Sequence, residues 1–149
     1  MGDTPYFTKL STERPWYEVD ATGQVLGRFA TAVAKLLIGK NRAEFQPGQD
    51  CGGFVVVINT DKITVTGAKL KQKLYYRHSG YPGGLKSRTL QECMHRDSTE
   101  VIRDAVKGML PKNKLGSRLI TKLKIYRGSE HPHKAQLPET MDVEQLARL

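Results

Sequence analysis

The sequence predicts an α/β domain built on a largely parallel sheet, and three observations support this class. Residues 54–58 (Phe-Val-Val-Val-Ile) form an uninterrupted, β-branched apolar run, which suits a strand covered on both faces. Residues 25–38 carry apolar side chains at the spacing of an amphipathic helix. Strand-like and helix-like segments alternate along the chain, as they do in α/β proteins.

The first half of the chain supplies a strand, a helix and two further strands. Trp16-Tyr17-Glu18-Val19-Asp20 is predicted to be the first strand. The helix at 25–38 ends at Gly39, and its apolar stripe consists of Val25, Leu26, Phe29, Ala30, Val33, Leu36 and Leu37. The run at 54–58 is the second strand. Residues 62–66 alternate as a third strand and stop at Gly67.

The second half begins with a capped helix. Asp97 and Glu100 resemble a capping box, in which Asp97 accepts from backbone N–H groups and Glu100 reaches back. The helix that they open has an apolar face through Leu110 and ends at Pro111. We expect a shorter helix over residues 115–123 and a last strand over residues 124–127.

Beyond residue 130 the chain is expected to be extended, because it contains Pro132 and Pro138, with a final helical turn near 143–149. The predicted organisation is an N-terminal extension (1–14), one α/β domain (15–128) and an extended C-terminal tail (129–149).

The charge of the chain points to a polyanionic partner. Lys and Arg number 24 against 15 Asp and Glu, a net charge of +9 with an isoelectric point near 9.7. Residues 62–127 hold 16 basic and 4 acidic residues, a net of +12. Such an excess favours nucleic acid over an anionic membrane. The alternative is that the charge only keeps the protein soluble.

The sequence shows no secretion signal, membrane span or disulfide framework. The longest apolar runs fall short of the roughly 18 residues that a span needs. Cys51 and Cys93 are predicted to be free thiols in a reducing compartment.

A basic run with two tyrosines is the first candidate RNA-binding segment. Its cations share a face in a strand and also align in a helix, so the inference holds for either structure. The tyrosine rings are suited to stacking on unpaired bases. The alternative is a solvated edge strand protected by its lysines. The candidate residues are Lys69, Lys71, Lys73, Tyr75, Tyr76, Arg77 and His78.

A glycine-rich loop follows directly and is the second candidate. Glycines beside cations allow backbone to approach a phosphate, and a literal G-x-x-G occurs at 80–83. Pro82 lacks an N–H group and weakens that match. A plain turn is the alternative. The candidates here are Gly80, Gly83, Gly84 and Lys86.

The third candidate surrounds Pro111. On the helix expected there, Lys114, Arg118 and Lys122 fall on one face at four-residue spacing, about 6 Å apart. Leu115, Leu119 and Leu123 fall on the neighbouring face and are expected to anchor the helix in the core. An exposed face with scattered lysines is the alternative. Lys107, Lys112 and Lys124 belong to the same basic segment.

His131 and His133 are expected to be loop residues that contact a phosphate or a neighbouring protein. Paired zinc ligands at C-x-x-C or H-x-x-x-H spacing are absent from the sequence, so no metal or other cofactor is predicted. The sequence also has no phosphate loop and no recognisable nucleophile motif, which argues against an enzyme.

These residues resemble the bacterial-type large-subunit ribosomal protein thirteen family over residues 16–138. The resemblance rests on WY at 16–17, DA at 20–21, LGR at 26–28, VVVIN at 55–59, TG at 66–67, YYRHSGYPGG at 75–84, AVKGMLPKN at 105–113, LKIY at 123–126 and HPHKAQ at 131–136. Gly53, Ser98-Thr99 and Ser117 depart from the family pattern, which puts local loop contacts in question.

The resemblance implies a three-layer α/β/α fold on a four-stranded parallel sheet. It also implies a structural role in the large ribosomal subunit, where the protein binds ribosomal RNA early in assembly beside neighbouring proteins such as three and twenty. Asp50-Cys51-Gly52 is similar to mitochondrial and alphaproteobacterial members, so a mitochondrial matrix is favoured over a bacterial cytoplasm or a plastid. The rival function is regulatory binding of messenger RNA away from the ribosome.

Overall fold

The computed structural model describes residues 14–142 and 145. Four parallel strands form one sheet in the order β5-β2-β1-β6, with β1 at Trp16–Asp20, β2 at Phe54–Ile58, β5 at Leu123–Ile125 and β6 at Glu139–Thr140. β2 lies between β1 and β5. Its pairing with β1 begins where Phe54 lies beside Trp16, and its pairing with β5 begins where Val55 lies beside Leu123. The predicted α/β class with a four-stranded parallel sheet is confirmed.

The central strand explains why this class could be predicted. Val55, Val56 and Val57 are completely buried, because β2 has a neighbour on each side and a packed layer on each face. Side chains alternate along a strand, so Val55 and Val57 face one layer and Val56 the other. A strand buried on both faces needs no polar residues, and its sequence is therefore continuously apolar.

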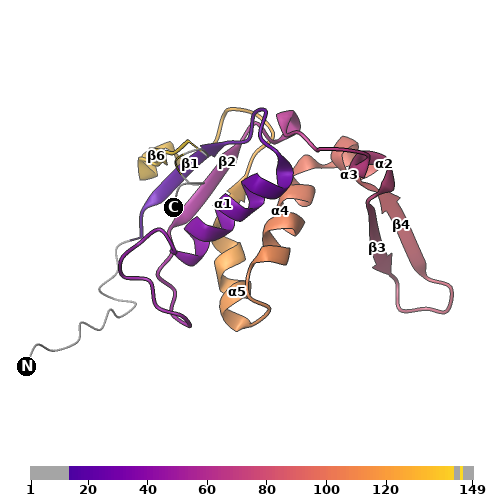
Figure 1. The fold of residues 1–149 in the computed structure, drawn as a ribbon, viewed down its shortest axis with the longest axis horizontal. Coiled ribbons are helices and arrows are strands. Elements are labelled where there is room, and N and C mark those ends of the chain that lie inside the picture. The colour runs from indigo at the N-terminus through magenta and orange to yellow at the C-terminus, as the bar shows by residue number, and fades with distance from the viewer. Residues whose placement is uncertain (1–13, 143–144, 146–149) are drawn as a thin grey trace, which may run out of the picture.

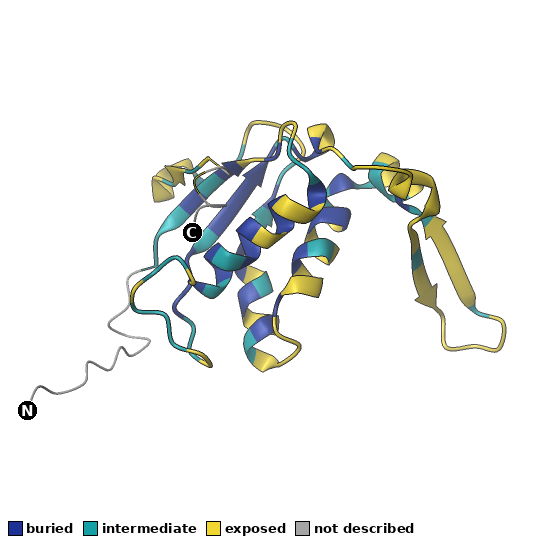
Figure 2. Cartoon of the chain, viewed as in Figure 1, coloured by how far each residue is buried: buried dark blue, intermediate teal, exposed yellow. Residues whose placement is uncertain are grey.

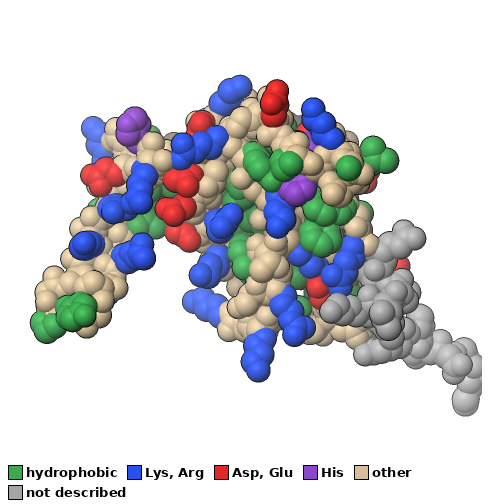
Figure 3. Space-filling model, turned by 180° about the vertical axis from the view of Figure 1, so that it is seen from behind, with side chains coloured by type: hydrophobic (Ala, Val, Ile, Leu, Met, Phe, Trp, Pro, Cys, Tyr) green, Lys and Arg blue, Asp and Glu red, His purple; other side chains and the backbone are tan. Residues whose placement is uncertain are grey.

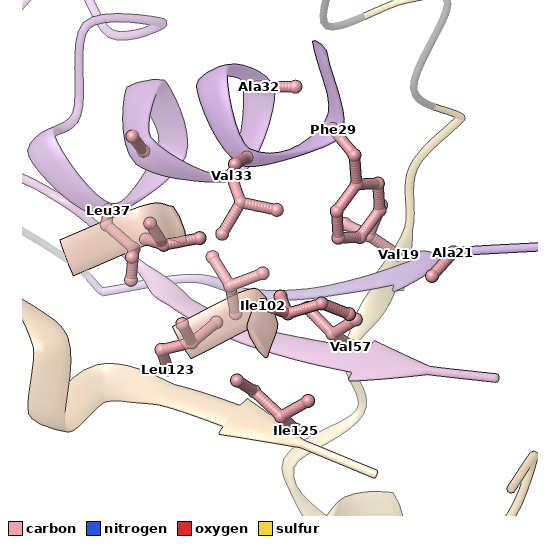
Figure 4. Close-up of a cluster of buried hydrophobic side chains, with 14 of the residues drawn as sticks. Val19, Ala21, Phe29, Ala32, Val33, Leu37, Val57, Ile102, Leu123 and Ile125 are labelled. Carbon is pink, nitrogen blue, oxygen red and sulfur yellow. The ribbon is translucent and has the colours of Figure 1, made fainter. Parts of the chain in front are cut away.

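One face of the sheet is covered by helices (Figure 1). α1 (Leu26–Ile38) and α4 (Ser98–Met109) pack against each other, and α5 (Lys114–Leu119) follows α4. Figure 4 shows how Phe29, Val33 and Leu37 of α1 meet Val57 and Leu123 of the sheet. The other layer is the segment that follows β5, in which His131 and His133 contact Glu18 and Trp16 of β1.

Local sequence sets the ends of the two long helices. α1 stops at Gly39, which has φ +87°, and a Cβ there would lie 2.8 Å from the Cys51 backbone. Asp97 caps α4 by accepting from the Thr99 backbone N–H at 3.0 Å. The predicted capping box is incomplete, because the Asp97 N–H already donates to the Cys93 carbonyl at 2.8 Å and is not available to Glu100.

The part of the chain between β2 and α4 departs most from the prediction. Residues 62–66 do not form a strand: η1 (Thr60–Lys62) is a 3-10 turn, and Thr64 makes a single bridge to Val25. The basic run divides into α2 (Lys69–Gln72) and β3 (Leu74–His78), so both alternatives left open by its pattern occur in succession. β3 pairs with the antiparallel β4 (Leu85–Thr89), and α3 (Leu90–Arg96) leads back to α4.

This two-stranded hairpin projects away from the sheet and its helices (Figure 1). It comprises β3, β4 and the turn at 79–84. Figure 2 shows that it is almost wholly exposed, whereas the body has a buried interior. A two-stranded sheet without a packed face is marginally stable in water. Within the chain it is supported at its base, where Tyr75 packs against the core.

The last elements differ in detail from those predicted. The helix expected at 115–123 is α5 followed by the 3-10 turn η2 (Ile120–Lys122), and β5 starts at Leu123. The segment after residue 130 is not wholly extended. It holds the 3-10 turn η3 (His133–Gln136) and β6, which pairs with β1. The helical turn expected near 143–149 falls on residues of which only Gln145 is described.

Candidate nucleic-acid interface

One face of the hairpin carries its cations. The register pairs Tyr75 with Arg88 and Arg77 with Lys86, and residues opposite one another in an antiparallel pair lie on the same face. Lys73 belongs to this face too, because its Nζ lies 5.1 Å from the centre of the Tyr75 ring. We call Lys73, Tyr75, Arg77, Lys86 and Arg88 the cationic face.

The cationic face lacks compensating negative charge on the hairpin itself. Residues 73–89 contain no Asp or Glu. Arg77 and Lys86 stand directly opposite each other, and like charges in that position repel. Across a cavity of about 380 Å³ lie Glu100 and Asp104 of α4, together with Arg103. A polyanion that neutralises the cationic face would remove this repulsion.

The glycine loop is a hairpin turn. Gly80 and Gly83 have φ of +88° and +71°, conformations that favour glycine. The Ser79 N–H donates to the Gly84 carbonyl at 3.1 Å, and the Gly80 N–H donates to His78 Nδ1 at 2.9 Å. The glycines and His78 thus shape the turn itself, and their contact with RNA stays a prediction.

A second cationic surface lies at the junction of α4 and α5. Asn113 caps α5 by accepting from the Gly116 N–H at 2.9 Å. A Cβ on Gly116 would lie 1.8 Å from the Pro111 carbonyl oxygen, so only glycine allows α5 to fold back this closely. Leu119 is buried as predicted, and Leu115 packs against the core from a half-buried position. The exposed cations of this surface are Lys107, Lys112, Lys114 and Arg118.

The two cationic surfaces occupy one side of the molecule. Figure 3 shows basic side chains on the hairpin and on the neighbouring part of the body. A cavity of about 630 Å³ beside α5 is lined by Lys107, Lys112, Asn113 and Ser117. The cap at Asn113 and the close approach at Gly116 fix the backbone from which these cations project.

The prediction that Lys122 faces outward is wrong. The chain leaves α5 for η2, which turns Lys122 inward until only 5% of it is exposed. Its ammonium pairs with Asp50 and donates to the Gly52 carbonyl at 3.1 Å. Burial lowers the pKa of Lys122, and the carboxylate of Asp50 only partly offsets this. Through these contacts Lys122, in the turn η2 after α5, binds the loop that contains Asp50 and Gly52.

His131 and His133 are likewise engaged within the chain. The His133 backbone N–H donates to His131 Nδ1 at 3.1 Å, so the hydrogen lies on Nε2, which donates to Glu18 Oε2 at 2.8 Å. His133 Nε2 meets the Tyr126 hydroxyl at 2.9 Å. Burial lowers the pKa of His133, with a further contribution from Lys124. Both imidazoles hold the C-terminal segment on the sheet, and both ring nitrogens of His131 have partners within the chain.

Comparison with known proteins decides the family. A family model described as Ribosomal protein L13 matches residues 14–132. The chain belongs to this family. A protein named large ribosomal subunit protein uL13 from Aquifex aeolicus is 60% identical over 131 residues, 88% of this chain and 91% of that protein. The uL13 protein of Synechococcus elongatus is 56% identical over 147 residues, 99% and 97% of the two chains. That of Symbiobacterium thermophilum is 52% identical over 143 residues, 96% and 100%.

The resemblance to this family is thereby confirmed, as is the prediction of a structural ribosomal protein that is not an enzyme. The three L13 relatives named above are bacterial, and the mitochondrial location favoured by Asp50-Cys51-Gly52 stays a prediction.

Two exposed arginines of this L13 chain were missed by the sequence reasoning. Arg88 extends the cationic face beyond Lys86, and Arg103 lines the cavity between the hairpin and α4. Lys86 and Arg88 are two residues apart, and a strand places such residues on one face, so this spacing could have pointed to Arg88. The pattern predicts only a loop at 79–86 and no strand after it, whereas the structure has β4 there.

The described residues hold no sign of a metal site or a membrane span. Residues 14–142 and 145 include no group of three metal-ligating side chains. No helix in these ranges has the length and apolar character that a membrane span requires. Cys51 and Cys93 are both free, and burial raises the pKa of Cys93.

Proposed function

We propose that this chain is a structural constituent of the large ribosomal subunit, where it binds large-subunit ribosomal RNA and supports assembly and translation. Its relatives carry the name large ribosomal subunit protein. The observation that carries the RNA contact is the placement of the +12 segment, whose cations are exposed on the hairpin and at the α4–α5 junction.

The RNA-binding residues follow from exposure and charge. The proposed contacts on and before the hairpin are Lys69, Lys71, Lys73, Arg77, Lys86 and Arg88, with the half-buried Tyr75 ring supporting Lys73 from beneath. Those at the α4–α5 junction are Arg103, Lys107, Lys112, Lys114 and Arg118. Lys122 and His131 are left out because their side-chain nitrogens have partners inside the chain. His133 is left out because its Nε2 meets the Tyr126 hydroxyl and its ring lies against Trp16. Lys124 is half-buried in β5 and contributes charge at a distance.

Phosphate contacts should dominate binding. Each phosphate neutralised by a Lys or Arg releases a condensed counterion, so the logarithm of affinity falls linearly with the logarithm of salt concentration. Amide and ring groups on the same surface would fix orientation rather than supply most of the affinity.

The test measures binding of the full chain to purified large-subunit ribosomal RNA over a salt series. Arg77→Ala with Lys86→Ala should weaken binding and make the salt slope shallower by about two, one for each phosphate that is no longer neutralised. Arg28→Ala with Lys40→Ala is the matched control, since both are exposed cations outside the two surfaces. A wild-type slope near zero, or sedimentation of the native protein with messenger RNA and not with large subunits, would contradict the proposal.

A further inference from the structure

The second face of the hairpin carries no Lys, Arg, Asp or Glu, and it presents three large hydrophobic side chains beside three polar ones. Alternation and register place Leu74 and Tyr76 of β3 with Leu85 of β4 on the side opposite the cationic face. Their exposed fractions are 42%, 64% and 61%. His78, Ser87 and Thr89 complete this side, which we call the apolar face.

Exposed apolar side chains are concentrated here. Seven large hydrophobic side chains are exposed within the described residues, and five of them lie on α2 or the hairpin: Leu70, Leu74, Tyr76, Tyr81 and Leu85. Scattered exposed leucines are ordinary, but a cluster marks an interaction site. The hairpin stands away from the body (Figures 1 and 2), and each of these side chains keeps 39% or more of its surface exposed.

Tyr75 and Tyr76 show how strictly the two faces are separated. The Tyr75 hydroxyl is buried, and its ring lies beneath the Lys73 ammonium. The next ring, Tyr76, is 64% exposed on the other side. All Lys and Arg side chains of the strands, namely Arg77, Lys86 and Arg88, share the face of Tyr75. The apolar face has none.

We propose that the apolar face docks onto an apolar patch of another protein of the large ribosomal subunit. This inference rests on the proposed function and assigns the partner of the hairpin's second side. Charge complementarity selects the occupant: RNA is a polyanion and is matched by the cationic face, whereas two aliphatic leucines without a cation suit an uncharged protein surface. A second copy of this chain is disfavoured, because each copy carries a net charge of +9.

The proposed contact has the form of an interface hot spot. Tyr76 stands opposite Ser87, with Leu74 two residues away on its own strand and Leu85 diagonally across on β4. A large aromatic ring is thus flanked by two aliphatic side chains, as in the anchor of an interface. The hairpin would then lie between RNA on one side and protein on the other. This arrangement also supplies the packed face that an isolated two-stranded sheet lacks.

Neighbouring positions on opposite faces give a matched cross-linking test. A photoreactive benzoylphenylalanine is placed at Tyr76 or Leu85 and, for comparison, at Arg77 or Lys86, in full-length chains incorporated into large subunits. Irradiation should join positions 76 and 85 to a second protein, and positions 77 and 86 to RNA. Cross-links from 76 and 85 to RNA or to another copy of this chain, or no cross-link, would overturn the inference. Failure of 77 and 86 to reach RNA would instead contradict the proposed function.

A serine variant gives an independent measurement. Leu74→Ser with Leu85→Ser removes two exposed side chains, neither of them a candidate RNA contact, so affinity for naked ribosomal RNA should stay within about twofold of wild type. Incorporation into large subunits in competition with wild type should fall on the order of 10-fold or more, as for loss of interface side chains. Arg77→Ser with Lys86→Ser should weaken binding to naked RNA. Equal competition by the Leu74 and Leu85 variant would refute the docking.

Discussion

Lys122 provides the sharpest test of the packing. Replacement by Met keeps an apolar chain of similar length and removes only the ammonium. Asp50, whose side chain is 11% exposed, would then retain Arg14 at 3.5 Å as its ion pair. Removing one member of a buried pair costs about 3–5 kcal/mol. Because Arg14 stays, we expect the free energy of unfolding to fall by an amount near the lower end, about 3 kcal/mol.

Urea unfolding of the full chain measures this change. With a slope of about 1.5 kcal/mol/M, a loss of about 3 kcal/mol lowers the midpoint by about 2 M, while the slope stays constant. Lys114→Met is the matched control: Lys114 is exposed on α5, and its replacement should cost less than about 0.5 kcal/mol. Adding Asp50→Asn to Lys122→Met removes the unpaired buried charge and should restore part of the lost stability.

Lys122 should also make the free energy of unfolding depend on pH in a defined direction. Burial lowers the pKa of Lys122 from its ordinary value of 10.5. Between the lowered and the ordinary value the unfolded chain binds more protons than the folded chain, so the contribution of Lys122 to stability rises with pH there. This contribution should be absent in Lys122→Met. A midpoint for Lys122→Met equal to that of wild type, with weakened RNA binding, would show that Lys122 faces outward and that the buried pair is wrong.

Two further predictions concern the helices. Leu119→Ala removes a side chain that is 1% exposed and should lower the free energy of unfolding by about 2–5 kcal/mol, so that RNA binding is lost only through unfolding. Arg118→Ala should leave the melting temperature nearly unchanged and make the salt slope of RNA binding shallower by about one. Equal effects of the two changes on the melting temperature would contradict this division. Asp97→Ala should cost about 1 kcal/mol as a lost helix cap. The hydrogen bond from the Thr99 hydroxyl, aided by Arg127, lowers the pKa of Asp97 below 3.8, so its contribution is present above that pH and is lost on further acidification. A pH-independent difference between wild type and Asp97→Ala in unfolding titrations would rule this out.

The parts of the fold that were predicted correctly are those in which burial and local sequence agree. The run at 54–58 is apolar because β2 is covered on both faces, and the stripe on α1 matches its packed side. Asp97 and Pro111 mark the limits of α4 because capping and the lost N–H act locally. Comparison of such patterns with the family therefore identified the chain without any tertiary information.

The missed features depend on contacts between distant parts of the chain. Lys122 has the spacing of an exposed helical cation, and only the approach of Asp50, far away in sequence, turns it inward. His131 has the sequence context of a free loop because its partner Glu18 is 113 residues away in the chain. His133 meets Tyr126 only seven residues earlier, but no periodic pattern marks that pair. The hairpin escaped prediction because β4, Leu-Lys-Ser-Arg-Thr, has no buried face and so no apolar alternation.

The parallel pairing of β1 with β6 has a consequence for the order of folding during synthesis. Tyr17 pairs with Glu139, so the outer edge of β1 remains without its partner strand until nearly the whole domain has left the polypeptide tunnel. The two strands of the hairpin, by contrast, are adjacent in sequence and pair from His78↔Leu85 onward, so their pairing needs no strand that is synthesised later. The packing of Tyr75 against the core is completed only when α4 has followed. The hairpin can therefore pair long before β6 closes the edge of the parallel sheet.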